Sequence, residues 1–132
     1  MKAFEVLLNS GTYNSSGSYF PTGQKVSVVP SIDLVSNFNI QGHKYLQTAN
    51  YIVGLCIDDI GNEDQGFHFG SKVDVVGHII QTRYNNRQYV IHATSNLKPD
   101  DLELKYDARI RDRMKEMFNL ILFDPKGKSL RK

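Results

Sequence analysis

The 132-residue sequence has a single cysteine and no tryptophan, and it lacks any long run of apolar residues. One cysteine cannot close a disulfide within the chain, so the fold depends on packing rather than on covalent bridges. Cys56 lies inside the apolar run 51–57, which favours a small buried side chain. No run is long enough to cross a membrane, and the first residues lack a signal-peptide pattern. We therefore expect one cytoplasmic domain, or one inside a host cell if the gene is viral or plasmid-borne, with no membrane partner.

Arginine is also missing from the first part of the chain, where every position before Arg83 lacks it. Residues 1–70 carry three lysines against six acidic side chains, whereas residues 71–132 carry thirteen lysines and arginines against eight acids. The small net charge of +2 therefore hides a basic C-terminal half. A localised basic surface is what a polyanionic partner requires, although a solvated face of mixed charge has the same composition.

Several motifs of catalysis and cofactor binding are missing as well. The sequence has no GxxxxGKS or GxxxxGKT phosphate loop, no GxGxxG fingerprint, no nucleophile elbow and no Cys/His metal pattern. We therefore expect no cofactor, no metal and no catalytic residue. His92-Ala93-Thr94 resembles half of the motif pair of two-histidine phosphoesterases, and residues 66–71 resemble part of ADP-ribosyltransferase-type domains. A small enzyme that uses His68 and His92 is thus the least favoured alternative.

Clusters of β-branched and aromatic residues predict strands in most of the chain. Residues 25–29 and 32–35 are β-branched runs separated by Pro30, which marks a break or a sheet edge. The apolar run 51–57 is followed by acidic and glycine residues, a pattern that predicts a buried strand. Residues 37–50 have no clear assignment.

The strongest local signal comes from two runs, 72–84 and 87–94, that flank Asn85-Asn86. Asparagine pairs tolerate the backbone angles of a tight turn, so this pattern predicts a long β-hairpin. A helix over 72–84 is the alternative, because its apolar residues also fit a spacing of 3.6. Gly77 and the density of valine and isoleucine favour strands over that helix.

After Pro99 the apolar spacing changes to that of a helix. This spacing predicts one amphipathic helix over residues 100–122 with an acidic first turn, followed by a short basic tail over residues 123–132. The apolar stripe of this helix consists of Ile110, Met114, Met117, Phe118 and Ile121. Such a stripe usually packs on the core, and a face for docking or self-association is the alternative.

Two segments carry a likeness to a known family. Residues 70–89 contain Gly70-Ser71-Lys72-Val73, Gly77, Thr82-Arg83-Tyr84, Arg87 and Tyr89, and residues 19–26 contain an aromatic pair followed by Pro-x-Gly. These segments resemble bacterial-type single-stranded DNA-binding proteins of the OB fold. The resemblance implies a five-stranded barrel that binds single strands. The missing tryptophan and the C-terminal helix depart from that family, and the helix is similar to that of small oligomeric single-strand binders.

The sequence therefore predicts a mainly β protein, with an OB-like β-barrel over residues 1–97 and one C-terminal amphipathic α-helix, within a single domain 1–132. The expected function is non-catalytic binding of single-stranded DNA or RNA by a basic, aromatic β-hairpin, in a homo-oligomer. The expected contact residues are Lys72, Arg83, Tyr84, Arg87, Tyr89, Tyr19, Phe20 and Lys25. Tyr84 and Tyr89 serve equally well as a cross-strand pair that stabilises the hairpin. An adaptor or oligomerising protein that docks through the C-terminal helix is the alternative function.

Overall fold

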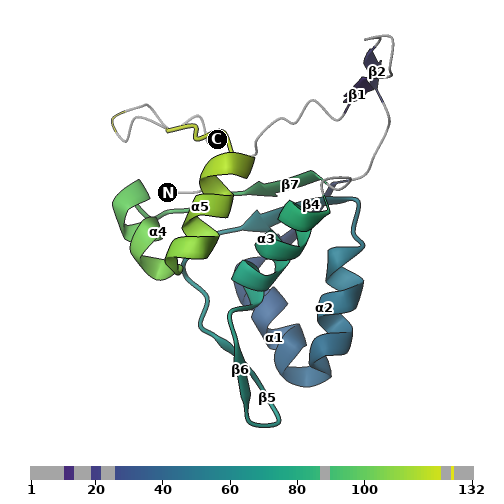
Figure 1. Ribbon diagram of the computed structural model, residues 1–132, viewed down its shortest axis with the longest axis vertical. Coiled ribbons are helices and arrows are strands. Elements are labelled where there is room, and N and C mark those ends of the chain that lie inside the picture. Colours follow the sequence, from purple (N-terminus) through teal and green to yellow (C-terminus); the bar gives the residue numbers. More distant parts are fainter. Residues whose placement is uncertain (1–10, 14–18, 22–25, 87–89, 123–125, 127–132) are drawn as a thin grey trace.

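The centre of the molecule is a three-stranded parallel sheet in the order β3-β4-β7 (Figure 1). The computed structural model describes residues 11–13, 19–21, 26–86, 90–122 and 126. The sheet consists of β3 (Val26–Pro30), β4 (Gly54–Asp58) and β7 (Val90–Ala93). The helices are α1 (Ser31–Gln41), α2 (His43–Asn50), α3 (Val75–Asn85), α4 (Pro99–Lys105) and α5 (Ala108–Met117). Two small hairpins pair β1 (Gly11–Tyr13) with β2 (Tyr19–Pro21), and β5 (Gly66–His68) with β6 (Ser71–Val73).

This architecture shows that the predicted OB-like barrel is wrong. The described residues form an α/β structure with no closed barrel, because neighbouring strands of the main sheet run parallel. Parallel strands cannot be joined by tight hairpins and need long crossover connections, usually helical. Residues 37–50, which had no assignment from sequence, fall in α1 and α2 and supply the first of these crossovers. The run 32–35, predicted as a strand, belongs to α1, which begins directly after Pro30.

The predicted hairpin around Asn85-Asn86 is also wrong, because residues 75–85 form the helix α3. The helix begins at an N-cap, where Oδ1 of Asp74 accepts a hydrogen bond of 2.8 Å from the backbone N–H of Gly77. A Cβ atom on Gly77 would lie 2.2 Å from Oδ2 of Asp74, so the glycine leaves room for the capping carboxylate. The glycine that favoured strands in the sequence thus belongs to a helix start.

The single helix predicted over residues 100–122 is divided into two. Tyr106 has extended backbone angles and separates α4 from α5. Asp107 then caps α5, because its Oδ1 accepts a hydrogen bond of 2.8 Å from the backbone N–H of Ile110. The predicted helix is therefore interrupted at Tyr106, and Asp107 starts α5.

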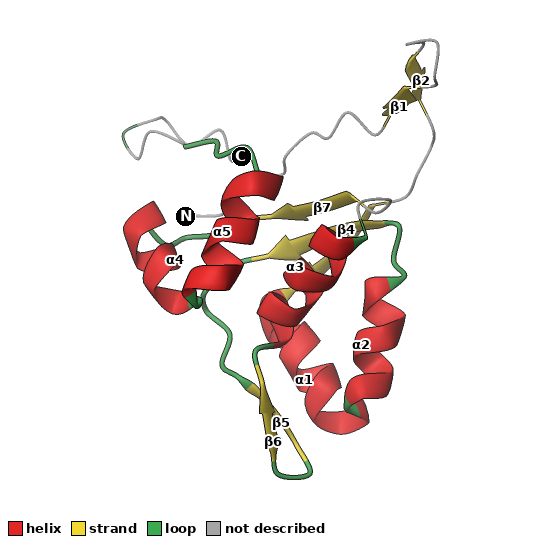
Figure 2. Ribbon diagram, in the orientation of Figure 1, coloured by secondary structure: helices red, strands yellow, loops and turns green. Residues whose placement is uncertain are grey.

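The hydrophobic core lies between the sheet and the helices, and β4 is its central strand. Leu55 and Ile57 are fully buried, which confirms the predicted buried strand from residue 54 onward, and Cys56 is buried as expected. Residues 51–53 of the predicted strand precede β4, and Tyr51 and Val53 are exposed. A central parallel strand is covered on both faces, so its residues are continuously apolar rather than alternating. Figure 2 shows α1, α2 and α3 grouped together against this sheet. Among the described helices, none has the length and apolar character needed to cross a membrane.

Candidate functional site

Polar side chains converge where the three parallel strands end. Ser31 follows β3, Asp58 and Asp59 close β4, and Thr94 and Asn96 follow β7. The parallel pairing places the carboxyl ends of these strands at one edge of the sheet. In open α/β sheets, this edge is where ligands bind. We therefore take this group of five residues, the carboxyl-edge cluster, as the candidate site.

Thr94 joins the two acidic residues of the cluster. Its hydroxyl donates to Oδ1 of Asp58 over 2.5 Å and accepts from the backbone N–H of Asp59 over 2.8 Å. Thr94 is buried, whereas both aspartates are half-buried and still reach solvent. One buried hydroxyl therefore fixes the orientation of the first carboxylate and the backbone of the second.

Asp59 holds an unusual backbone conformation, with φ at 62°. This left-handed region costs a residue with a side chain roughly 1 to 3 kcal/mol, and such strain concentrates at functional sites. The Asp59 carboxylate accepts hydrogen bonds from the amide groups of Asn96 (2.9 Å) and Asn62 (2.6 Å). Its carbonyl oxygen accepts a bond of 2.8 Å from the hydroxyl of Ser31, which is almost fully buried. All three strand ends thus hold Asp59 in place.

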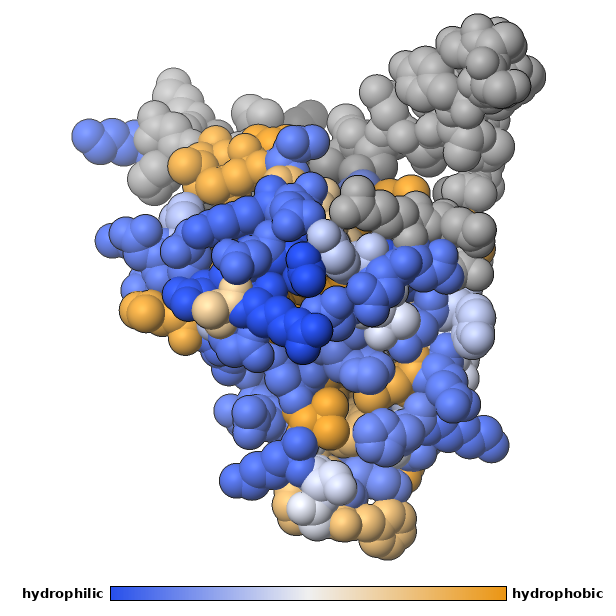
Figure 3. Space-filling view, viewed as in Figure 1, coloured by the Kyte–Doolittle hydropathy of each residue, from blue (hydrophilic) through white to orange (hydrophobic). Residues whose placement is uncertain are grey.

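A groove of about 820 Å³ runs beside β7 and adjoins the cluster, since Thr94 and Ser95 line part of it. Its walls come from β7, the following loop, α4, α5 and the segment that ends at Leu122. Strand β7 pairs only with β4 among the described strands, so its outer edge faces this groove. Figure 3 shows apolar residues at the end of α5, where Leu120, Ile121 and Leu122 are exposed.

The structure does not bring together those sequence-predicted nucleic-acid residues that lie in its described part. Arg83 lies in α3 and is buried, and its guanidinium donates to the carbonyl oxygens of Ala49, Ile52 and Val90. Lys72 is exposed in β6, and Tyr19 and Phe20 belong to β2. Lys25, Arg87 and Tyr89 lie outside the described residues.

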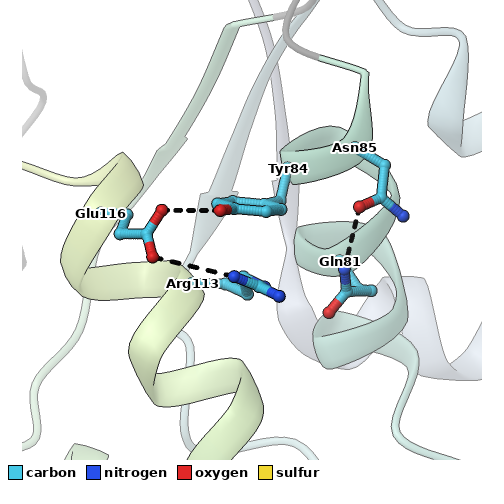
Figure 4. A network of polar contacts seen from close by, with 5 residues as sticks. All are labelled: Gln81, Tyr84, Asn85, Arg113 and Glu116. Atoms are coloured by element: carbon cyan, nitrogen blue, oxygen red, sulfur yellow. Dashed lines mark hydrogen bonds and ion pairs between the residues drawn. The ribbon is translucent and has the colours of Figure 1, made fainter.

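Tyr84 contacts two residues of α5. Its hydroxyl donates to Oε2 of Glu116 over 2.7 Å, and the Arg113 guanidinium lies 4.0 Å from the centre of its ring (Figure 4). Arg113 also forms an ion pair of 3.7 Å with Glu116. These contacts join α3 to α5, so the tyrosine serves the packing of two helices.

The apolar stripe predicted for self-association mostly faces the core. Ile110 is buried, and Met114, Met117 and Phe118 pack against the core cluster. Ile121 lies beyond the end of α5 and is exposed. The geometry therefore favours the core-packing role that the sequence also allowed.

The sequence interpretation missed the carboxyl-edge cluster. Its local patterns place Asp58 and Asp59 in the segment that ends a strand, and Thr94 in half of a phosphoesterase motif. The sequence held a partial signal, because a continuous apolar run is typical of a strand in a parallel sheet. Ligands bind at the carboxyl ends of such strands, and Asp58 and Asp59 follow directly there. His68 and His92 lie on separate sheets, in β5 and β7, and burial lowers the pKa of the His92 imidazole.

Comparison with family models, curated proteins and solved structures finds no match for this chain. The interpretation of the site therefore depends on its geometry.

Proposed function

We propose that this chain forms the magnesium-binding side of a nucleoside triphosphate site, in which Asp58 and Asp59 hold Mg²⁺ bound to the phosphates. The observation that carries this proposal is the pair of carboxylates, Asp58 and Asp59, at the end of the buried strand β4. They accept hydrogen bonds from Thr94 and Asn96, which follow the neighbouring strand β7. In P-loop nucleoside triphosphatases, an aspartate holds the Mg²⁺ that bridges the β- and γ-phosphates. The proposal does not depend on an OB barrel, because the parallel main sheet excludes that fold.

The number of acidic ligands suits magnesium together with a nucleotide. No group of three or more His, Cys, Asp or Glu side chains within the described residues is arranged to hold a metal ion by itself. Mg²⁺ keeps several waters and is usually bound by one or two carboxylates plus substrate phosphates. Two half-buried aspartates therefore match a site that is completed by phosphate rather than by more protein ligands.

Asn96 adds a group for the reacting end of the nucleotide. Its side chain is exposed and donates to Asp59, so its amide lies at the rim of the acidic pair. Phosphoryl transfer to water requires a polar side chain that orients the attacking water. We assign this orienting role to Asn96 and the metal-holding role to Asp58 and Asp59.

A phosphate-cradling loop must come from another segment, because the 132 residues contain no GxxxxGKS or GxxxxGKT sequence. We place that segment beside β7, where the strand has an open edge among the described strands and the groove of about 820 Å³ adjoins Thr94. A strand added there would carry its following loop to the same carboxyl edge as the aspartates.

The test uses Mn²⁺ as a paramagnetic substitute for Mg²⁺. The ¹⁵N-labelled chain is titrated with Mn²⁺, first alone and then with ATP, and the broadening of each amide signal is followed. We expect the amides of Asp59, Ile60 and Asn96 to broaden first. Asp58→Asn and Asp59→Asn should raise the Mn²⁺ concentration required by about tenfold or more.

Asp112→Asn, an exposed carboxylate on α5, is the matched control and should leave the titration unchanged. Uniform broadening, or a titration that neither site variant alters, would remove the proposed metal site.

Single-stranded nucleic-acid binding is a second candidate, and a different hairpin from the predicted one supports it. The β5–β6 hairpin carries Phe69, which is 94% exposed, and Phe67, which is 54% exposed and lies opposite Lys72 in the strand register. Figure 3 shows this hairpin at the lower end of the molecule. Exposed rings beside a cation are the elements that stack bases and contact phosphates.

Self-association and a cytoplasmic location remain predictions from the sequence.

Fluorescence anisotropy with labelled oligothymidine at two salt concentrations tests this second candidate. Phe69→Ala should weaken binding by about tenfold, since a stacked base contributes roughly 1 to 3 kcal/mol. Ile40→Ala replaces another exposed apolar side chain and serves as the control. Equal affinities for the two variants would rule out stacking on the hairpin.

A further inference from the structure

A buried carboxylate lies just beyond the acidic pair. Glu63 is 3% exposed, and Oε2 of its carboxylate accepts a hydrogen bond of 2.7 Å from the backbone N–H of Gly61. Oε1 accepts a hydrogen bond from the hydroxyl of Tyr106, which is 4% exposed. Burial, together with the bond to Glu63, raises the pKa of the Tyr106 hydroxyl, so it remains a proton donor. Both groups thus satisfy each other in the interior.

The contacts of Glu63 lead directly to Asp59. Gly61 has φ at 96°, a conformation that favours glycine, and Asn62 lies between Gly61 and Glu63. The amide of Asn62 donates to Oδ2 of Asp59 over 2.6 Å. Because Glu63 anchors the backbone on both sides of Asn62, it also sets where Asn62 meets the Asp59 carboxylate.

The other side of the same contacts belongs to the C-terminal helices. Tyr106 is the first residue after α4. Lys105, the last residue of α4, donates through its ammonium group to the carbonyl oxygen of Glu63. Asp107, the next residue, caps α5. The loop that carries Asp59 is therefore fastened to the α4–α5 junction by two consecutive side chains.

We infer that Glu63 and Tyr106 are positioning residues that couple the α4–α5 junction to the Asp59 carboxylate. This inference rests on the proposed metal site and adds a means of regulating it. The segment that we place beside β7 would contact α4 and α5, which line the groove there, and would change the placement of Asp59 through them. Metal affinity then responds to what occupies that groove.

Tyr106→Phe tests the coupling, because it removes one hydroxyl and keeps the ring that fills the core. We expect the Mn²⁺ concentration needed to broaden the Asp59 amide to rise by about tenfold, as for other residues that orient metal ligands. In the metal-free protein, the amides of Gly61 and Asn62 should exchange with solvent faster, while those of β4 stay as protected as before. Glu63→Gln should show the same local change, and the double variant should add little to either single one.

Tyr45→Phe is the control, since this tyrosine is also partly buried but its hydroxyl faces Asn37. Unchanged Mn²⁺ binding and unchanged Gly61 exchange in Tyr106→Phe would overturn the coupling. If Asp59→Asn still weakens Mn²⁺ binding in that case, the proposed metal site stands without the coupling. If local exchange rises in Tyr106→Phe while Asp59→Asn has no effect on Mn²⁺, the proposed metal function fails together with the regulation inferred from it.

Discussion

Thr94 shows how much of the site depends on one side chain. Its hydroxyl serves both aspartates, and its backbone N–H and carbonyl oxygen pair with Ile57 and Ile60 across the strand ends. The β4–β7 pairing and the acidic turn therefore meet at this residue. Valine has nearly the same shape and lacks the hydroxyl, so a Thr94→Val change separates the two contributions.

We expect Thr94→Val to lower the free energy of unfolding by about 1 to 3 kcal/mol, because it leaves the Asp59 N–H and the Asp58 carboxylate without their shared partner. Urea unfolding measures the change. Thr48→Val on α2 removes an exposed hydroxyl that bonds only the preceding turn, and should change stability far less. Equal losses in both variants would contradict the role assigned to Thr94.

At the scale of elements, the Asp74 cap makes the start of α3 sensitive to pH. Burial raises the pKa of the Asp74 carboxyl above its ordinary value, whereas the bond from the Gly77 N–H acts in the opposite direction. A carboxyl with a raised pKa in the folded state binds its proton more tightly there than in the unfolded chain. Its contribution to stability is complete at low pH and is lost as pH rises through the raised pKa.

Asp74→Asn keeps the capping oxygen and removes the titration. We therefore expect this variant to gain stability relative to the parent as pH rises from acidic values through the raised pKa of Asp74. Urea midpoints measured across this range test the trend, with Asp112→Asn as an exposed control. A constant difference across the range would show that Asp74 does not titrate differently on folding.

The contact between α3 and α5 gives a second prediction at this scale. The sequence indicates two roles for the Tyr84 ring, a surface that stacks bases or a cross-strand partner of Tyr89 in a hairpin. Since the ring packs under Arg113 and its hydroxyl bonds Glu116, we now expect a loss of about 1 to 2 kcal/mol in the free energy of unfolding. Tyr84→Phe, which keeps the stacked ring, should lose less, and thermal unfolding distinguishes the two.

At the scale of the whole molecule, the parallel sheet sets the order of local stability. Strand β4 is paired on both sides and buried, whereas the β5–β6 hairpin is a separate two-stranded sheet with exposed rings. Amides that open only with global unfolding exchange most slowly. We expect the amides of Leu55 and Ile57 to exchange slowest and those of the hairpin much faster, as measured by hydrogen exchange in NMR. Similar rates in both would contradict this order.

The sequence predicted secondary structure and burial correctly where a segment has one clear local pattern. The buried β4, the buried Cys56 and a helical pattern after Pro99 all follow from local composition. It failed for α3, because a short run of valine and isoleucine satisfies both the strand pattern and the helix spacing. The helix is favoured because the Asp74 side chain caps its start. A short polar residue before an apolar run is typical of a helix N-terminus, and Asp74 is such a residue.

The sequence by itself determined that β4 is buried and how the charges are distributed along the chain, because a continuous apolar run favours burial. Only the tertiary structure decided that β3, β4 and β7 run parallel, since strand direction depends on crossovers that span many residues. That direction brings Ser31, Asp59 and Thr94 together at one edge, although they are far apart in the chain. The candidate site exists for this reason, and local sequence patterns do not show which distant residues meet at that edge.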